Sequence, residues 1–117
     1  MQQILLVEDD ALTALVTSLA LEDGGYGVHH AQNAAEAIDA LKVDGFAALV
    51  TDIDLGQGED GFGVARHWRA LHPHGLVVFV SGQDAHRYAQ EAVHPSDLIT
   101  KPFEPDQVVA LLNKRLH

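Results

Sequence analysis

The sequence predicts an α/β fold, a doubly wound sheet of five parallel strands with helices on both faces. Two observations predict it. Short apolar runs alternate with segments in which apolar residues recur every three or four positions, and glycine, proline or acidic residues separate the two kinds of segment. The chain has 117 residues, of which 47% are hydrophobic and 21% are charged, as in one globular domain over residues 1–117.

The first strand is expected at residues 4–7, an apolar run short enough for a strand buried on both faces. The next segment has apolar residues on one helix face, the pattern by which a helix packs on a core: Leu12, Leu15, Val16 and Leu19. Gly24 ends this helix. A second strand is expected at residues 26–31. Asn33 and Glu36 then form a capping pair at the start of a second helix.

The rest of the chain repeats the alternation, with strands and helices expected at residues 46–50, 62–71, 76–80, 85–92 and 97–100. A loop rich in glycine and acidic residues follows the third strand. The last helix begins near Pro105, where the missing N–H costs little. Five β-α units in a row imply parallel strands joined by right-handed crossovers.

Composition excludes several classes of function. Seven Lys and Arg against 17 Asp and Glu give a net charge of −10, and the basic residues are scattered, so we expect no direct contact with nucleic acid. No apolar run approaches the roughly 20 residues of a membrane span, and no signal peptide pattern opens the chain. The sequence has no cysteine, which excludes disulfides and thiolate chemistry. We expect a cytoplasmic location.

Polar side chains follow the predicted strands at the point where each strand ends. Glu8 and Asp9 follow the first strand, Asp52 the third, Ser81 the fourth and Lys101 the fifth. The carboxyl ends of parallel strands meet at one edge of a sheet, so these side chains are expected in one crevice. Clustered carboxylates repel, and Mg²⁺ is the hard, oxygen-preferring cation that suits them. With one hydroxyl and one ammonium, the set suits phosphoryl transfer onto a carboxylate.

Four stretches carry a resemblance to a known family: Ile4-Leu-Leu-Val-Glu-Asp-Asp10, Val50-Thr-Asp-Ile-Asp-Leu55 with Asp60-Gly-Phe62, Val78-Phe-Val-Ser81 and Thr100-Lys-Pro-Phe103. The chain resembles the receiver domain of two-component response regulators over nearly all of its length. This resemblance implies a flavodoxin-like (βα)5 fold with strand order 2-1-3-4-5. It also implies a signalling switch and not an enzyme, one that catalyses only its own phosphorylation and dephosphorylation.

The resemblance assigns roles to particular residues. Asp52 would accept a phosphoryl group from a sensor histidine kinase or a phosphotransfer protein. Lys101 would contact that group, aimed by a cis peptide bond before Pro102, and Ser81 would turn toward it and carry the switch to a downstream protein target. The implied Mg²⁺ ligands are Glu8 through a water, Asp9, Asp52 and the backbone carbonyl of Asp54. Asp10 is expected to cap the first helix.

Three features depart from the family pattern. Leu98 stands where the family often has an aromatic residue, which puts coupling to the last strand and helix in doubt. The loop after Asp52 contains Gly56 and is slightly long. Asp54 adds a charge beside the phosphorylation site, and together with Gln83 it is expected to tune dephosphorylation by water.

Other functions and states remain open. Asp52 and Asp54, two positions apart, also resemble the nucleophile motif of haloacid-dehalogenase-type phosphatases, although that motif normally lies on the first strand of a larger domain. A receiver fold that only binds a partner, without phosphorylation, is a third reading. The sequence does not separate a stand-alone regulator from a piece of a longer one, and it leaves a homodimer open.

Overall fold

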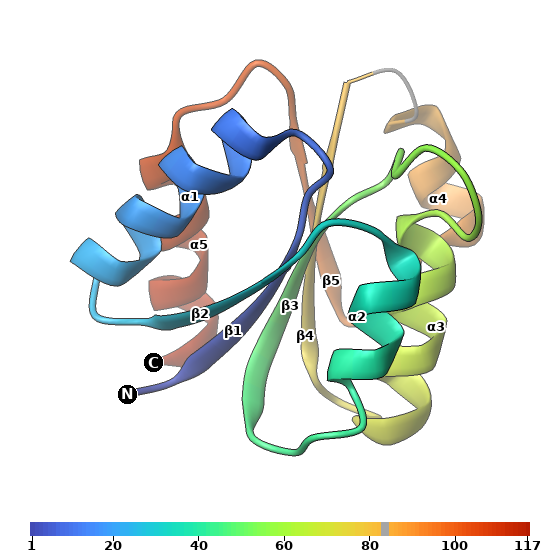
Figure 1. The fold of residues 1–117 in the computed structure, drawn as a ribbon, viewed down its shortest axis with the longest axis horizontal. Helices are drawn as coiled ribbons and strands as arrows, with labels where there is room; N and C mark the ends of the chain where they lie inside the picture. The colour runs from blue at the N-terminus through green and yellow to red at the C-terminus, as the bar shows by residue number, and fades with distance from the viewer. Residues whose placement is uncertain (83–84) are drawn as a thin grey trace.

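The computed structural model describes residues 1–82 and 85–117. Within these residues one sheet has the strand order β2-β1-β3-β4-β5, and each neighbouring pair is parallel (Figure 1). The strands are β1 (Gln3–Val7), β2 (Gly27–Ala31), β3 (Phe46–Asp52), β4 (Leu76–Ser81) and β5 (Ser96–Thr100). The predicted fold class and strand order are confirmed.

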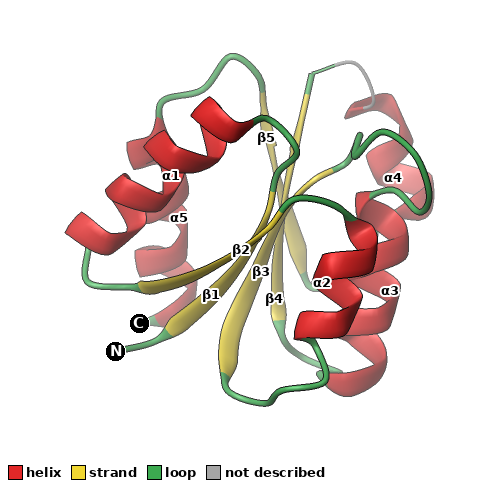
Figure 2. Ribbon diagram, viewed as in Figure 1, coloured by secondary structure: helices red, strands yellow, loops and turns green. Residues whose placement is uncertain are grey.

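Helices cover both faces of this sheet (Figure 2). One face carries α1 (Ala11–Asp23) and α5 (Pro105–Leu116), and the other carries α2 (Ala34–Ala40), α3 (Gly61–Leu71) and α4 (Tyr88–Glu91). A short 3₁₀ turn at Ala85–Arg87 leads into α4. The helix expected at residues 85–92 is therefore only partly α-helical.

Each face of the sheet has its own apolar core, because successive side chains of a strand point to opposite sides. Leu5 and Val7 of β1 pack under α2 and α3, whereas Ile4 and Leu6 pack under α1 and α5. This is why the first strand is a continuous apolar run with no polar alternation. Trp68 of α3 is fully buried in the first core, and its ring stacks on His72 with 4.0 Å between centroids.

The apolar face predicted to pack α1 on the core lies at the surface instead. We call the residues of this face, Leu12, Leu15, Val16 and Leu19, the α1 stripe. Their exposed fractions are 68% for Leu12, 54% for Leu15, 43% for Val16 and 56% for Leu19. The buried residues of α1 are Ala14, Thr17 and Leu21, which also recur at helical spacing. The prediction for this face was wrong because periodicity identifies residues that share a face but not what covers it.

Smaller differences concern where elements end. The third strand continues through Thr51 to Asp52, so the acid belongs to β3 and does not follow it. Tyr26 is buried but precedes β2. Leu71, at the end of α3, is 56% exposed. Within residues 1–82 and 85–117, no helix is long and apolar enough to cross a membrane.

Candidate functional site

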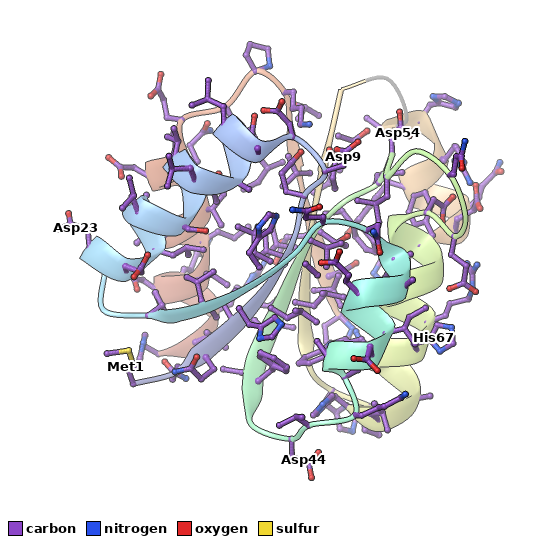
Figure 3. The ribbon with its side chains drawn as sticks, in the orientation of Figure 1. Met1, Asp9, Asp23, Asp44, Asp54 and His67 are labelled. Atoms are coloured by element: carbon purple, nitrogen blue, oxygen red, sulfur yellow. The ribbon has the colours of Figure 1, made fainter. Side chains whose placement is uncertain are left out.

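A pocket of about 280 Å³ lies at the carboxyl edge of the sheet. Figure 3 shows Asp9 and Asp54 at this edge, far from Asp44 and Met1 at the opposite end of the molecule. The lining residues are Glu8, Asp9, Asp10, Asp52, Asp54, Ser81, Gly82 and Lys101. The structure thus brings all six predicted site residues into one pocket, while their roles stay predictions.

The acidic wall of the pocket combines buried and exposed carboxylates. Glu8 and Asp52 are only 4% and 6% exposed, and Asp9 is exposed. One carboxylate oxygen from each of the three lies within 4.8 Å of the others. Burial, followed by the nearby charge of Asp52, raises the pKa of Glu8 from its ordinary value to about 7. Burial likewise raises the pKa of Asp52, against the opposing effect of Lys101.

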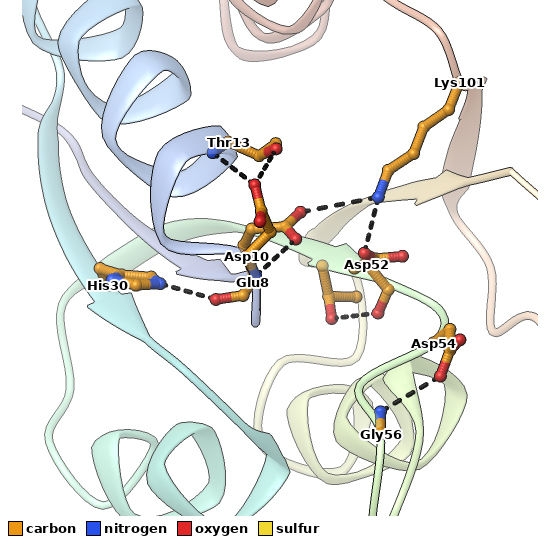
Figure 4. A network of polar contacts seen from close by, with 9 residues as sticks. Glu8, Asp10, Thr13, His30, Asp52, Asp54, Gly56 and Lys101 are labelled. Carbon is orange, nitrogen blue, oxygen red and sulfur yellow. Dashed lines mark hydrogen bonds and ion pairs between the residues drawn. The ribbon is translucent and has the colours of Figure 1, made fainter.

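Lys101 is the counterion of this wall (Figure 4). Its Nζ donates a hydrogen bond to Oδ2 of Asp52 at 2.8 Å and lies 3.9 Å from Oε2 of Glu8. Burial lowers the pKa of the ammonium, but the hydrogen bond and the charges of Asp52 and Glu8 outweigh burial and raise it. The lysine therefore stays charged and holds the Asp52 carboxylate in a fixed position.

The turn after β1 is fixed by local hydrogen bonds. The Glu8 carboxylate accepts from the N–H of Asp10 at 3.1 Å, and the Glu8 carbonyl lies 2.8 Å from Nε2 of His30 on β2. Asp10 accepts from both the N–H and the hydroxyl of Thr13, which confirms it as the cap of α1. The bonds made by Glu8 orient its side chain in the pocket. The bonds from Thr13 engage the Asp10 side chain in capping α1.

The backbone after Asp52 is held by close contacts with the start of α3. The N–H of Gly61 donates to the Ile53 carbonyl at 2.8 Å, and a Cβ on Gly61 would lie 2.1 Å from the Asp52 carbonyl oxygen. The start of α3 is therefore held directly against the strand end that carries Asp52. Between them, Asp54 accepts from the N–H of Gly56, whose φ of +79° is the left-handed conformation that glycine permits.

The far wall of the pocket comes from β4 and the segment after β5. Ser81 is 2% exposed, and its carbonyl accepts from the N–H of Lys101 at 2.8 Å. The peptide bond between Lys101 and Pro102 is cis, as expected. Leu98 is partly buried against the core that contains Trp68. Gln83 lies outside the described residues, so its part in dephosphorylation stays a prediction.

Arg87, which was not among the predicted site residues, joins two elements beside the site. Its guanidinium donates to Oδ2 of Asp60 and to both oxygens of Glu91. These bonds hold the pKa of Glu91 below its usual range, with the hydrogen bond to Arg87 as the main cause. The i, i+4 spacing of Arg87 and Glu91 was a visible signal of a helical pair. No sequence pattern indicated that Asp60, which is 27 positions away, would be the second partner of Arg87.

The residues present fit a divalent cation. Three carboxylates face one ammonium, and burial together with the charge of Asp52 raises the pKa of Glu8, so a cation placed here would favour its ionised form. An all-oxygen donor set of this kind matches the preference of Mg²⁺.

Comparison with known proteins decides the family. The family model described as response regulator receiver domain matches residues 4–113. The chain belongs to this family. Response regulator receiver protein CpdR of Brucella abortus is 33% identical to it over 99% of this chain and 98% of CpdR. The crystal structure of a response regulator receiver protein from Sinorhizobium medicae superposes with a TM-score of 0.92 at 33% identity, covering 97% of this receiver domain and 92% of that chain.

Other relatives are longer or more distant. The alginate biosynthesis transcriptional regulatory protein AlgB of Pseudomonas putida is 33% identical over 97% of this receiver domain, which spans only 26% of AlgB. TrrA of Thermotoga maritima, solved in complex with Mg²⁺ and BeF, has a TM-score of 0.83 at 21% identity over 97% of this chain and 98% of TrrA, and shows the fold alone.

Proposed function

We propose that this receiver domain is a phosphoacceptor switch of a two-component system, and that Asp52 takes a phosphoryl group from the phosphohistidine of a sensor histidine kinase or phosphotransfer protein. The observation that carries the proposal is the 2.8 Å contact of Lys101 with Asp52 inside a pocket that three carboxylates share. A buried aspartate next to a positive charge is held ready to act as a nucleophile.

The chain's own residues supply positioning and charge. A carboxylate oxygen of Asp52 forms the new P–O bond as the P–N bond to the donor histidine breaks, and the imidazole leaves with the electron pair of that bond. Lys101 lies where it can hold one phosphoryl oxygen. Ser81 lines the same pocket and can offer its hydroxyl to another oxygen.

Glu8, Asp9, Asp52 and the Asp54 carbonyl are the residues that would hold Mg²⁺. The ion would neutralise charge on the transferring group, as metal ions do in phosphoryl transfer. TrrA, which shares the fold, was solved in complex with Mg²⁺ and BeF.

A protein donor needs a docking surface beside the pocket mouth. A largely apolar groove of about 600 Å³ runs between α1 and the segment after β5, and its lining includes Leu12, Val16, Phe103 and Lys101. Lys101 lines both this groove and the acidic pocket. We therefore assign the α1 stripe and this groove to the phosphodonor protein, which would act in the cytoplasm. The downstream target is a protein of a kind that the fold does not specify.

The test is intact mass after treatment with acetyl phosphate and Mg²⁺. We expect the parent to gain one phosphoryl group and Asp52→Asn to gain none. Lys42→Gln, which removes an exposed lysine just after α2, is the control and should label like the parent. Equal labelling of parent and Asp52→Asn would refute the assignment of Asp52.

The same samples separate the alternative functions. Continuous turnover of a generic phosphate ester would favour the phosphatase reading, in which Asp54 serves as the acid/base. An unchanged mass in the presence of Mg²⁺ and acetyl phosphate would favour a module that only binds a partner. A single phosphoryl group that stays on Asp52 long enough to be detected supports the receiver.

A further inference from the structure

The region between the pocket and α4 contains one cation held by two carboxylates. Arg87 lies in the 3₁₀ turn before α4, and its guanidinium reaches Asp60 at 2.9 Å and Glu91 through two hydrogen bonds. The guanidinium carbon also lies 5.1 Å from the ring centroid of Phe62. We call this set, Arg87 with Asp60 and Glu91, the Arg87 clamp.

One end of the clamp is attached rigidly to the phosphorylation site. Asp60 caps α3 through Oδ1, which accepts from the N–H of Gly63 at 3.0 Å, and offers its other oxygen to Arg87. The next residue, Gly61, is packed against the Asp52 carbonyl with no space for a side chain. A displacement of the strand end at Asp52 therefore moves Asp60, because Gly61 lies directly against the Asp52 carbonyl and its N–H bonds the Ile53 carbonyl.

The other end of the clamp is an element that lies at the edge of the core. Neither the 3₁₀ turn nor α4 has a fully buried residue, and α4 has no side-chain cap at its N-terminus. Its main apolar anchor is Tyr88, whose ring meets Phe79 of β4 at 5.8 Å between centroids. The Tyr88 hydroxyl lies 2.9 Å from the Ser96 hydroxyl on β5. Arg87 on one side and Tyr88 on the other thus both hold α4.

We infer that Arg87 is a positioning residue that couples the state of the Asp52 pocket to α4 and the adjoining strand β5, through Asp60 at the start of α3. The inference rests on the proposed function, because a phosphoryl group or its mimic is the ligand that would displace the Asp52 loop. Tyr88 connects α4 to β5, because its hydroxyl contacts that of Ser96.

Coupling of this kind has a measurable signature that simple stabilisation lacks. A clamp that only stabilises α4 would change amide exchange of α4 equally with and without ligand. A clamp that transmits the state of the site makes ligand binding change that exchange, and its removal erases the change.

The experiment is hydrogen exchange of the peptides covering residues 85–98, with and without saturating Mg²⁺ and beryllofluoride as the phosphoryl mimic. In the parent we expect the ligand to alter exchange there. In Arg87→Gln we expect this ligand-dependent difference to fall at least threefold. Arg87→Lys keeps the charge but lacks the planar set of donors that bonds Asp60 and both oxygens of Glu91, so it should restore only part of the difference.

Two further variants make the test specific. Asp60→Asn keeps the helix cap but loses the ion pair, and it should match Arg87→Gln, with no further loss in the double variant. Lys42→Gln makes the same charge change in an exposed pair with Asp39 and should behave as the parent. A parent that neither binds beryllofluoride nor labels defeats the proposed function and the coupling with it. A parent that binds, while Arg87→Gln keeps the full ligand response, defeats the coupling alone.

Discussion

The β1–α1 and β3–α3 units are built alike up to the first turn of each helix and differ beyond it. Each strand delivers acids to the pocket, Glu8 and Asp9 from one and Asp52 from the other. Each helix then begins at an aspartate cap, Asp10 or Asp60. After the cap, α3 buries most of its first two turns, whereas α1 turns large apolar side chains to the surface.

This difference teaches that the two helices serve the site in different ways. The α3 helix is part of the rigid frame, because its first turn is fixed to the Asp52 backbone and its Trp68 fills the core. The α1 helix is fixed at its cap and through Ala14, Thr17 and Leu21, and the α1 stripe remains available to another molecule. An exposed apolar stripe next to a charged pocket is typical of a partner-binding surface.

The largest expected effect is the loss of stability when a core side chain of α3 is removed. Trp68→Ala should lower the free energy of unfolding by about 3–5 kcal/mol, because it removes a fully buried ring and leaves a cavity. Leu19→Ala in the α1 stripe should cost less than about 0.5 kcal/mol, since that side chain is already 56% exposed. Urea unfolding followed by circular dichroism measures both. Equal losses would mean that α1 packs as tightly as α3.

The next effect concerns Glu8, which precedes α1, and the dependence of stability on its ionisation. Glu8 has a folded-state pKa of about 7 against an ordinary value of 4.5, so folding favours its protonated form. Its contribution to stability is full below pH 4.5 and is lost as the pH rises through about 7. Without metal, this loss should be about 3 kcal/mol relative to Glu8→Gln.

Unfolding in urea at pH 4 to 8, with chelator, measures this dependence. The parent should lose stability over that window, and Glu8→Gln should lose less. Glu22→Gln, an exposed glutamate on α1, is the matched control. Parallel curves for the parent and Glu8→Gln would show that Glu8 is not the titrating group.

The comparison is sharpened by testing the α1 stripe for partner binding. Leu15→Gln should slow phosphotransfer from a donor protein about tenfold, equivalent to about 1.4 kcal/mol, and leave labelling by acetyl phosphate unchanged. Leu71→Gln on α3 is the control, because Leu71 is 56% exposed and Leu15 is 54% exposed. The transfer rates are read by intact mass. A rate for Leu15→Gln equal to that of Leu71→Gln would remove α1 from the docking surface.

The smallest effect compares the two caps. Asp10→Ala should cost about 1 kcal/mol, because two hydrogen bonds to Thr13 are lost, and Asp10→Asn should recover most of that cost. Asp60→Ala should cost more than Asp10→Ala, since it loses the bond to Arg87 as well as the cap. Thermal unfolding of the parent, Asp10→Ala, Asp10→Asn and Asp60→Ala gives the order of their stabilities. A reversed order would contradict the anchoring of the Arg87 clamp.

Much of the fold followed from local pattern. The apolar runs of β1, β3 and β4 are buried on both faces, so their sequence identifies them without knowledge of their neighbours. The acids, serine and lysine at the strand ends were found because parallel topology gathers strand ends at one edge. Asp10 was assigned as a cap from its position before a helix.

What could not be predicted depended on packing between distant segments. The α1 stripe and the buried set of Ala14, Thr17 and Leu21 both have helical spacing, and larger side chains made the wrong set look like the core face. The helix at residues 85–92 lacks a strong pattern because it has no fully buried residue. The ion pair of Arg87 with Asp60 joins two loops across the fold and leaves no local signal.

The burial of Trp68 gives this chain a built-in optical probe. It is the only tryptophan in the sequence, so the whole indole fluorescence comes from one ring sealed in the core beside His72. Trp68 lies seven residues, about 10 Å of helix, along α3 from Gly61. Emission therefore reports whether the core beneath α3 is folded.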